Sequence, residues 1–173
     1  MTSKLILITG GTSGIGLSLA RSLFSPEYKL INISRSVPSK ENSKYFYDNY
    51  NFDLLDNEKK LKNTLVEIKK NDIFFDGLIA CSGIQKIAPI INIKEEDLFK
   101  IFQINLFSNV ILMKNLLRLS LLKKNASVIF MSSISSHRPD PGISPYSMSK
   151  AGLDNFVKAA ATECSSKNIR VNS

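Results

Sequence analysis

Tyr146 and Lys150 are four residues apart in the run Tyr146-Ser147-Met148-Ser149-Lys150. On an α-helix, residues at this spacing lie on one face, so the phenol and the ammonium would be neighbours. A free tyrosine has a pKa near ~10, and an adjacent fixed cation favours the phenolate and moves that pKa toward neutrality. The pair could then give a proton to a carbonyl oxygen or take one from an alcohol. The same spacing is also common on solvated helices that have no chemical role.

A glycine-rich turn follows the first apolar run of the chain, in Thr9-Gly10-Gly11-Thr12-Ser13-Gly14-Ile15-Gly16. Glycines permit a tight turn and the close approach of a pyrophosphate. The free N–H groups and the dipole of the helix that follows would hold the phosphates. This strand–turn–helix context predicts a nucleotide site rather than a merely structural turn. The predicted cofactor-binding residues here are Gly10, Thr12, Ser13, Gly14, Ile15 and Gly16.

The second predicted strand ends at Ser34-Arg35, without an acidic residue. An acid at this position would bind a ribose 2′-hydroxyl, whereas an arginine accommodates a 2′-phosphate. We therefore expect NADP(H) rather than NAD(H), with Arg35 as the residue that selects it. The alternative is that Arg35 only covers the adenine face or is solvated.

Strand and helix patterns alternate along the chain, which predicts an α/β fold: a parallel sheet between two layers of helices. Right-handed crossovers make it a doubly wound, Rossmann-type sheet with ligands at the carboxyl ends of its strands. The expected strands are 4–9, 28–34, one ending near Phe52, 77–81, 127–131 and 169–172. The expected helices are 13–24, 58–70, 95–123 with a break near Asn105, and 144–165, with Ser144 as cap and Pro145 in the first turn. Residues 1–173 are expected to form a single domain.

Composition excludes several classes of function. The net charge is +8, but the lysines are scattered and interleaved with acids, so a solvated surface is favoured over nucleic-acid binding. Polar residues interrupt the apolar stretch 98–122, so no membrane span is expected. Two cysteines without a disulfide pattern favour a reducing, cytoplasmic setting. His137 is the sole histidine, so we expect no histidine-rich metal site.

The glycine spacing in 9–16 and Tyr146-x-x-x-Lys150 together resemble the short-chain dehydrogenase/reductase family. Ser133, 13 positions before Tyr146, and Asn105 match that family's catalytic serine and asparagine. The resemblance extends from residue 4 to residue 172. Gaps of three and one residues between the glycines resemble the short, single-domain reductases rather than the extended sugar epimerases.

The resemblance implies a role for each matched residue. Tyr146 would be the general acid/base, and Lys150 would lower its pKa and contact the nicotinamide ribose. Ser133 would hydrogen-bond the substrate oxygen, with Ser132, Ser135 and Ser136 as alternatives. Asn105 would hold a water that links Lys150 to solvent. The remaining cofactor contacts implied by the resemblance are Asp53 at the adenine, Leu54 and Gly83, together with Tyr146 and Lys150 themselves.

Two departures from the family pattern bear on the site. Where the family commonly has Asn-Asn-Ala-Gly, this chain has Ala80-Cys81-Ser82-Gly83, so the asparagine that braces the central strands is replaced. Family members also continue past 169–172 with a Pro-Gly turn, a substrate lid and a seventh strand. We therefore expect a chain that is incomplete at its C-terminus, without the last strand and the lid, and weakly active or inactive by itself. It would be a fragment of a longer parent, a product that turns over poorly, or a chain completed by another.

The leading functional hypothesis is an NADP(H)-dependent oxidoreductase that transfers hydride between nicotinamide and a carbonyl or hydroxyl substrate. Candidate substrates are a 3-keto acyl thioester, a sugar or a free ketone. The alternative is a nucleotide-binding pseudoenzyme that senses the redox cofactor with little turnover. The resemblance implies that the long helix and the helix carrying Tyr146 pair with their copies in a second subunit. The many apolar residues of 104–122 fit such pairing, so we expect a homodimer or homotetramer.

Overall fold

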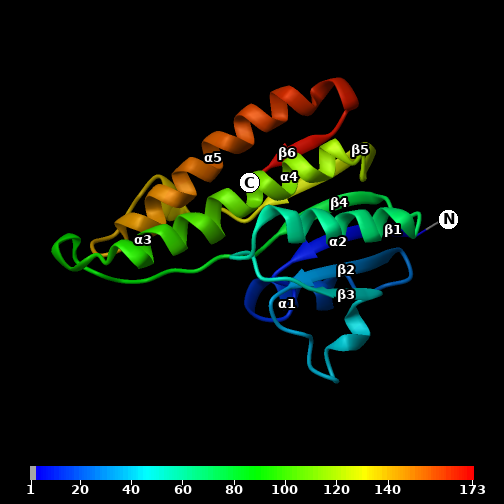
Figure 1. The fold of residues 1–173 in the computed structure, drawn as a ribbon, viewed down its shortest axis with the longest axis horizontal. Helices are drawn as coiled ribbons and strands as arrows, with labels where there is room; N and C mark the ends of the chain where they lie inside the picture. Colours follow the sequence, from blue (N-terminus) through cyan, green and yellow to red (C-terminus); the bar gives the residue numbers. More distant parts are fainter. Residues whose placement is uncertain (1–2) are drawn as a thin grey trace.

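A parallel sheet of six strands forms the middle layer of residues 3–173, the part of the chain that the computed structural model describes (Figure 1). Its order is β3-β2-β1-β4-β5-β6, so successive connections move outward in both directions from β1 and β4. This reversal creates a crevice at the carboxyl ends of the central strands. The predicted doubly wound, Rossmann-type fold is confirmed. The strands are β1 (Lys4–Thr9), β2 (Tyr28–Ser34), β3 (Asp48–Asn51), β4 (Phe75–Ala80), β5 (Leu122–Phe130) and β6 (Arg170–Asn172).

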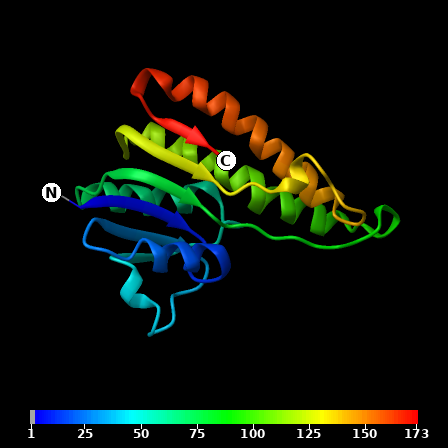
Figure 2. The same ribbon diagram turned by 180° about the vertical axis from the view of Figure 1, so that it is seen from behind.

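Helices cover both faces of this sheet, as predicted. Figures 1 and 2 show α2 and α4 on one face and α1 on the other. The larger core cluster joins α2, α4 and α5 to side chains such as Leu78 and Val128, and the smaller one joins Ala20 of α1 to Ile8 and Leu30. Alternate strand residues thus enter opposite clusters, which is why the central strands are apolar throughout. The helices are α1 (Gly14–Ser22), α2 (Glu58–Lys70), α3 (Glu95–Phe102), α4 (Ser108–Arg118) and α5 (Ser144–Cys164).

The predicted helix 95–123 is correct in its break and wrong in its end. The helix is interrupted by a π-helical turn, Gln103–Phe107, which contains Asn105. It ends at Arg118 because Ser120 takes a left-handed backbone conformation, with φ of +53°. Leu121 and Leu122, which continue the apolar pattern of the helix in the sequence, are buried at the entrance to β5 instead. Strand β5 therefore begins five residues earlier than the predicted 127.

The start of α5 also differs from the prediction. Ser144 is the first residue of the helix, and Ile143 is the capping residue, with no side-chain hydrogen bond to the helix end. Pro145 does lie in the first turn, where its missing N–H costs nothing. No helix among residues 3–173 is long and apolar enough to cross a membrane.

Candidate active site

A cleft of about 360 Å³ opens at the carboxyl ends of β1, β2 and β4. Every residue that the sequence assigned to the cofactor outside α5 lines it: Gly10, Thr12, Ser13, Gly14, Ile15, Gly16, Arg35, Asp53, Leu54 and Gly83. Tyr146 and Lys150 lie outside this lining. The sequence reasoning missed neighbours of the predicted residues at or just after the same strand ends, namely Ser34, Ser36, Phe52, Cys81, Ser82 and Ile84, and also Ile104 of the helical segment Gln103–Phe107.

The glycine turn forms the floor of the cleft. Gly10 has a φ of +69°, which side chains disfavour. A Cβ on Gly16 would lie 2.3 Å from the carbonyl oxygen of Gly10, so α1 can start this close to the turn only with glycine there. Within the described residues, the backbone N–H groups from Thr12 to Gly16 have no acceptor. Ser13 makes no side-chain cap hydrogen bond either. The turn therefore presents unpaired donors at the positive end of a helix, which suits a phosphate.

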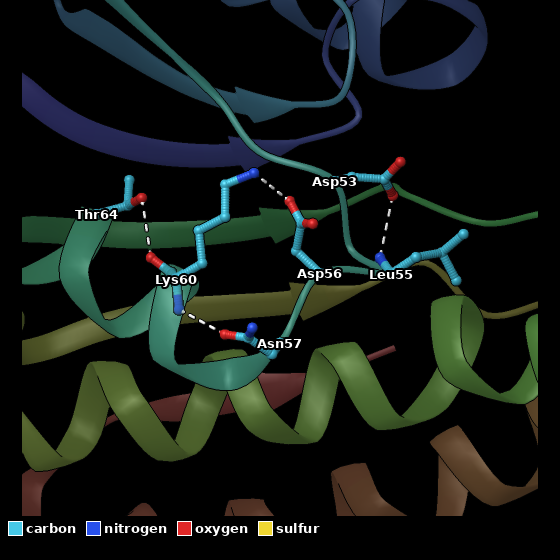
Figure 3. Close-up of polar contacts among 6 residues, drawn as sticks. All are labelled: Asp53, Leu55, Asp56, Asn57, Lys60 and Thr64. Atoms are coloured by element: carbon cyan, nitrogen blue, oxygen red, sulfur yellow. Dashed lines mark hydrogen bonds and ion pairs between the residues drawn. The ribbon is translucent and has the colours of Figure 1, made fainter.

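Arg35 and Asp53 stand at the ends of neighbouring strands on the rim of the cleft. Arg35 is exposed and has no carboxylate within ion-pair distance in the part of the chain that is described. Asp53 Oδ1 accepts a hydrogen bond of 3.0 Å from the Leu55 N–H, which closes a short turn after β3 (Figure 3). The turn fixes the Asp53 carboxyl at the rim, and the guanidinium of Arg35 remains available to an anion.

Figure 3 also shows how the start of α2 is held beside this turn. Asn57 Oδ1 accepts the Lys60 N–H at 3.0 Å and caps the helix. The Lys60 ammonium pairs with Asp56. Lys60 is thus paired locally and does not line the cleft, whereas Arg35 is the lysine or arginine that the described lining contains.

Helix α5 brings Tyr146 and Lys150 side by side, with Lys150 Nζ 5.8 Å from the centroid of the tyrosine ring. Lys150 is only 3% exposed, and its Nζ donates a hydrogen bond of 2.6 Å to the Met131 carbonyl oxygen. Met131 lies two residues before Ser133, so this bond ties α5 to the segment that carries the serine. Burial lowers the pKa of Lys150, and the charge of Asp154 offsets part of that effect.

Asn105 links the cleft to α5 through all of its side-chain polar atoms. Its Oδ1 accepts the Ile84 N–H at 2.8 Å, and its Nδ2 donates to the Ile84 carbonyl at 2.9 Å and to Ser149 Oγ at 3.0 Å. The Ser149 hydroxyl donates in turn to the Tyr146 carbonyl oxygen at 2.7 Å. Asn105 lies in the π-helical turn, and its side chain reaches both partners from there.

Gly83 is the point at which the cleft and the Tyr146–Lys150 pair meet. A Cβ at this position would lie 3.4 Å from Asn105 Oδ1 and 3.5 Å from Lys150 Nζ. Gly83 also lines the cleft. The ammonium of Lys150 is therefore adjacent to the nucleotide cleft, although its own element is distant in sequence.

Ser133 begins a short 3₁₀ turn, Ile134–Ser136, which packs against α5. Its Oγ accepts the Ser135 N–H at 3.2 Å. The alternative serines Ser132 and Ser136 have buried hydroxyls without a hydrogen bond of good geometry among the described residues. Both nevertheless lie close enough to Asp154 to lower the pKa of its carboxyl. These two hydroxyls thus face Asp154.

Asp154 is a charged neighbour of the site that sequence reasoning missed. It follows Lys150 by one helical turn and accepts a hydrogen bond of 2.9 Å from Ser173 Oγ, with His137 Nε2 at 3.6 Å. Burial raises the pKa of Asp154, but Ser136, Ser132 and Ser173 more than offset it, so the carboxyl stays ionised. The four-residue spacing from Lys150 was the signal available in the sequence.

Cys81 occupies the position where the family pattern has asparagine, and it lines the cleft. Burial raises the pKa of its thiol to about 11, and the Lys150 ammonium opposes this only in part. The thiol is therefore neutral near pH 7 and acts as a small packing group.

Comparisons with known proteins agree with this geometry. The family model for short chain dehydrogenases matches residues 4–173. Carbonyl reductase family member 4 of Xenopus laevis is 31% identical over 98% of this chain and 73% of its own length. The 3-oxoacyl-acyl-carrier-protein reductase FabG of Rickettsia prowazekii is 34% identical over 99% of this chain and 71% of its own length.

Solved structures extend the same likeness to three dimensions. A short chain dehydrogenase of Leptospira borgpetersenii with bound NAD⁺ has a TM-score of 0.89 and 26% identity, and the match covers 99% of this chain and 70% of that one. A 4-hydroxyisoleucine dehydrogenase complexed with NADH and succinate has a TM-score of 0.85 and 25% identity, over 97% of this chain and 77% of that one. Motifs, fold and family model agree, and the chain belongs to the short-chain dehydrogenase/reductase family of oxidoreductases, which have an NAD(P)-binding Rossmann fold.

Proposed function

We propose that residues 1–173 form one dinucleotide-binding and catalytic domain of an NADP(H)-dependent carbonyl reductase or alcohol dehydrogenase. The observation that carries this proposal is the buried Lys150 ammonium, which adjoins both the Tyr146 ring and the cleft at Gly83. A buried cation costs free energy unless it is used or paired. Here it lies where a proton donor, a nicotinamide ribose and a substrate oxygen would meet.

In this proposal, one set of residues binds the cofactor and another set transfers the proton. The N–H groups of 12–16 and the α1 dipole would bind the pyrophosphate, with Asp53 and Leu54 at the adenine. A bound nicotinamide supplies or accepts the hydride. Tyr146 gives a proton to the carbonyl oxygen in reduction and takes it back in oxidation, while the Lys150 ammonium stabilises the negative charge left on the phenol oxygen.

Ser133 and Asn105 would complete the catalytic set. The Ser133 hydroxyl hydrogen-bonds the substrate oxygen and stabilises the charge that develops on it. Asn105 holds the Ile84 loop and Ser149 in place, and a water held near it would return protons to Lys150. Such positioning keeps the reacting groups aligned before the substrate binds.

NADP(H) is the proposed cofactor because the end of β2 carries Arg35 between Ser34 and Ser36 and no acid. The structural relatives with NAD⁺ and NADH indicate that members of the family also take the non-phosphorylated cofactor. An unpaired guanidinium at the rim adds a favourable contact for a 2′-phosphate that NAD(H) lacks. The substrate class that the relatives' names favour is a small carbonyl compound, with a 3-keto acyl thioester first.

We also infer that the chain assembles as a homodimer or homotetramer. Large apolar side chains remain exposed on the neighbouring helical segments that include α3 and α5, notably Phe99, Phe107 and Met148. Multi-angle light scattering that returned a monomer at micromolar concentration would contradict the assembly.

We further infer that the protein is located in the cytoplasm. Both cysteines are free, which fits a reducing compartment.

Cofactor titration and a turnover assay test the proposal together. Quenching or enhancement of NADPH and NADH fluorescence gives the two dissociation constants, and NADPH oxidation with a panel of 3-keto acyl thioesters, sugars and ketones gives turnover. We expect tighter binding of NADPH and oxidation with at least one carbonyl compound. Equal affinity for both cofactors would reject the NADP(H) assignment. Tight cofactor binding without turnover of any carbonyl would instead support a redox-cofactor sensor.

A further inference from the structure

Asn32 is a buried polar residue in an otherwise apolar strand, and the proposed mechanism does not use it. It is 1% exposed and lies in β2 between Ile31 and Ile33, which belong to the core. A valine or isoleucine would fill this central strand position at a lower free-energy cost than an asparagine, because burying an amide side chain without hydrogen bonds is strongly unfavourable. The amide must therefore be held by partners.

Those partners join the two walls of the cofactor cleft. Asn32 Oδ1 accepts the Gly11 N–H at 3.0 Å, and Nδ2 donates to Ser34 Oγ at 2.8 Å and to Asn49 Oδ1 at 3.1 Å. A Cβ on Gly11 would lie 2.6 Å from Asn32 Oδ1, so the turn is seated directly on the amide. Both donors and the acceptor of the side chain are used.

The network continues past Arg35. The Ser34 hydroxyl donates a hydrogen bond of 2.7 Å to the Ser36 carbonyl oxygen, so the residues on either side of Arg35 are bonded to each other. Ser34, Arg35 and Ser36 all line the cleft. One continuous set of hydrogen bonds thus runs from the glycine turn, through Asn32, to the loop that presents the guanidinium.

We propose that Asn32 is a positioning residue for cofactor selectivity: through Ser34 it holds the Arg35 loop in fixed relation to the glycine turn. This inference rests on the proposed preference for NADP(H). A loop fixed before binding loses less conformational freedom when the 2′-phosphate is captured. NAD(H) has no group for Arg35 to capture, so fixing the loop helps NADP(H) more. The proposed signature is a change in the ratio of the two affinities, which a merely structural role would leave unchanged.

The test compares NADPH and NADH dissociation constants, measured by cofactor fluorescence, in Asn32→Ala, Ser34→Ala and Asn115→Ala. Asn115→Ala is the matched control, because Asn115 is also buried and hydrogen-bonded, to Glu58 and Ile111, but lies away from the cleft. We expect the first two variants to lower the preference for NADPH about fivefold, the effect of losing one ordinary hydrogen bond. The control should keep the wild-type ratio.

An unchanged ratio in folded Asn32→Ala and Ser34→Ala overturns the inference. If Asn32→Ala does not fold, as judged by circular dichroism, Ser34→Ala decides, since it cuts the same network and removes only one hydroxyl. Arg35→Ala separates this result from a failure of the proposed function. A wild-type chain without NADPH preference, or one whose preference survives Arg35→Ala, overturns the cofactor assignment and the inference with it. A preference that needs Arg35 but not Asn32 or Ser34 overturns only the inference.

Discussion

The cofactor cleft meets the cluster around Lys150, formed by Asn105, Tyr146, Ser149 and Lys150, at Gly83. The two regions differ in whether their polar groups have hydrogen-bond partners within the protein. In the cleft, the N–H groups from Thr12 to Gly16 have no acceptor among the described residues, and Arg35 has no ion pair there. In the cluster, Asn105 uses every polar atom of its side chain, and Lys150 is bonded to a carbonyl oxygen.

This difference separates two ways of building a functional site. The cleft leaves donors unpaired, and a phosphorylated ligand would pair them. The cluster pairs its groups inside the protein, and the pairing fixes where Lys150 and Tyr146 stand before any ligand arrives. The unpaired donors of the cleft are mostly backbone N–H groups of one turn, whereas the cluster consists of side chains on helical segments. Substitutions in the cleft should therefore mainly weaken cofactor binding, whereas substitutions in the cluster should mainly lower turnover or stability.

The largest expected effect is on turnover in Tyr146→Phe. Removal of the phenol hydroxyl removes the proposed proton donor, so we expect turnover to fall by about 10²–10⁴-fold. NADPH binding should change much less than turnover, because Tyr146 does not line the cleft. Steady-state NADPH oxidation and cofactor titration measure the two quantities. Tyr45→Phe, near α1, is the matched control, and a Tyr146→Phe variant with normal turnover would exclude the acid/base role.

The next effect concerns the floor of the cleft. Gly16→Ala would place a methyl group 2.3 Å from the Gly10 carbonyl oxygen, which must displace the turn. NADPH affinity should fall at least about tenfold, or ~1.4 kcal/mol. Gly142→Ala is the control: Gly142 does not line the cleft, and its φ of +84° also disfavours alanine, at about 1–2 kcal/mol of folding stability. Isothermal titration calorimetry should show weaker binding in Gly16→Ala than in Gly142→Ala. The reverse order would contradict the close approach of α1.

The third effect concerns the hydrogen bonds that Asn105 makes inside the cluster. Asn105→Ala leaves the Ile84 N–H and carbonyl without their partner, and the free energy of unfolding should fall by about 1–3 kcal/mol. Urea denaturation measures this, with the exposed Asn63→Ala on α2 as control. NADPH binding should weaken less than in Gly16→Ala. An Asn105→Ala variant as stable as wild type would show that the hydrogen bonds to Ile84 contribute nothing.

The smallest effect is expected at Asp76, at the opposite end of the sheet from both regions. Its carboxylate accepts hydrogen bonds of 2.8 Å from the Leu5 N–H and from Lys123 Nζ. Burial raises the pKa of Asp76, but Lys123 and the Leu5 N–H more than offset it, so the pKa is lower than in the unfolded chain. The stabilisation is therefore present above the unfolded pKa and is lost as the pH falls through the folded pKa.

The substitution Asp76→Asn tests this direction of the pH dependence of stability. The variant should be less stable than wild type by about 1 kcal/mol near neutral pH, and the difference should shrink as the pH falls below about 4. Urea unfolding at several pH values measures it. NADPH affinity should be unchanged, since Asp76 does not line the cleft. A stability difference that grew toward acid pH would contradict the assignment.

The sequence predicted most of the fold and the local parts of the site. The strands at 4–9 and 28–34 and the helix at 58–70 have the predicted bounds, because short apolar runs and an amphipathic period are local signals. The end of the helix predicted over 95–123 was wrong, because Leu121 and Leu122 are equally apolar in a helix and in a buried strand. Only the sheet decides between the two, by giving them a place beside Phe75.

By itself, the sequence determined the spacings that a single turn or helix converts into geometry. The glycines of 10–16 and the pair Tyr146 and Lys150 belong to this class, since backbone geometry over a few residues fixes their relation. Asn32 under the glycine turn, Asn105 between Ile84 and Ser149, and Asp154 beside Ser173 were decided only by the tertiary structure. Their partners lie 19 to 44 positions away. Hydrogen bonds over such separations depend on which strands, helices and loops become neighbours, and no local pattern contains that arrangement.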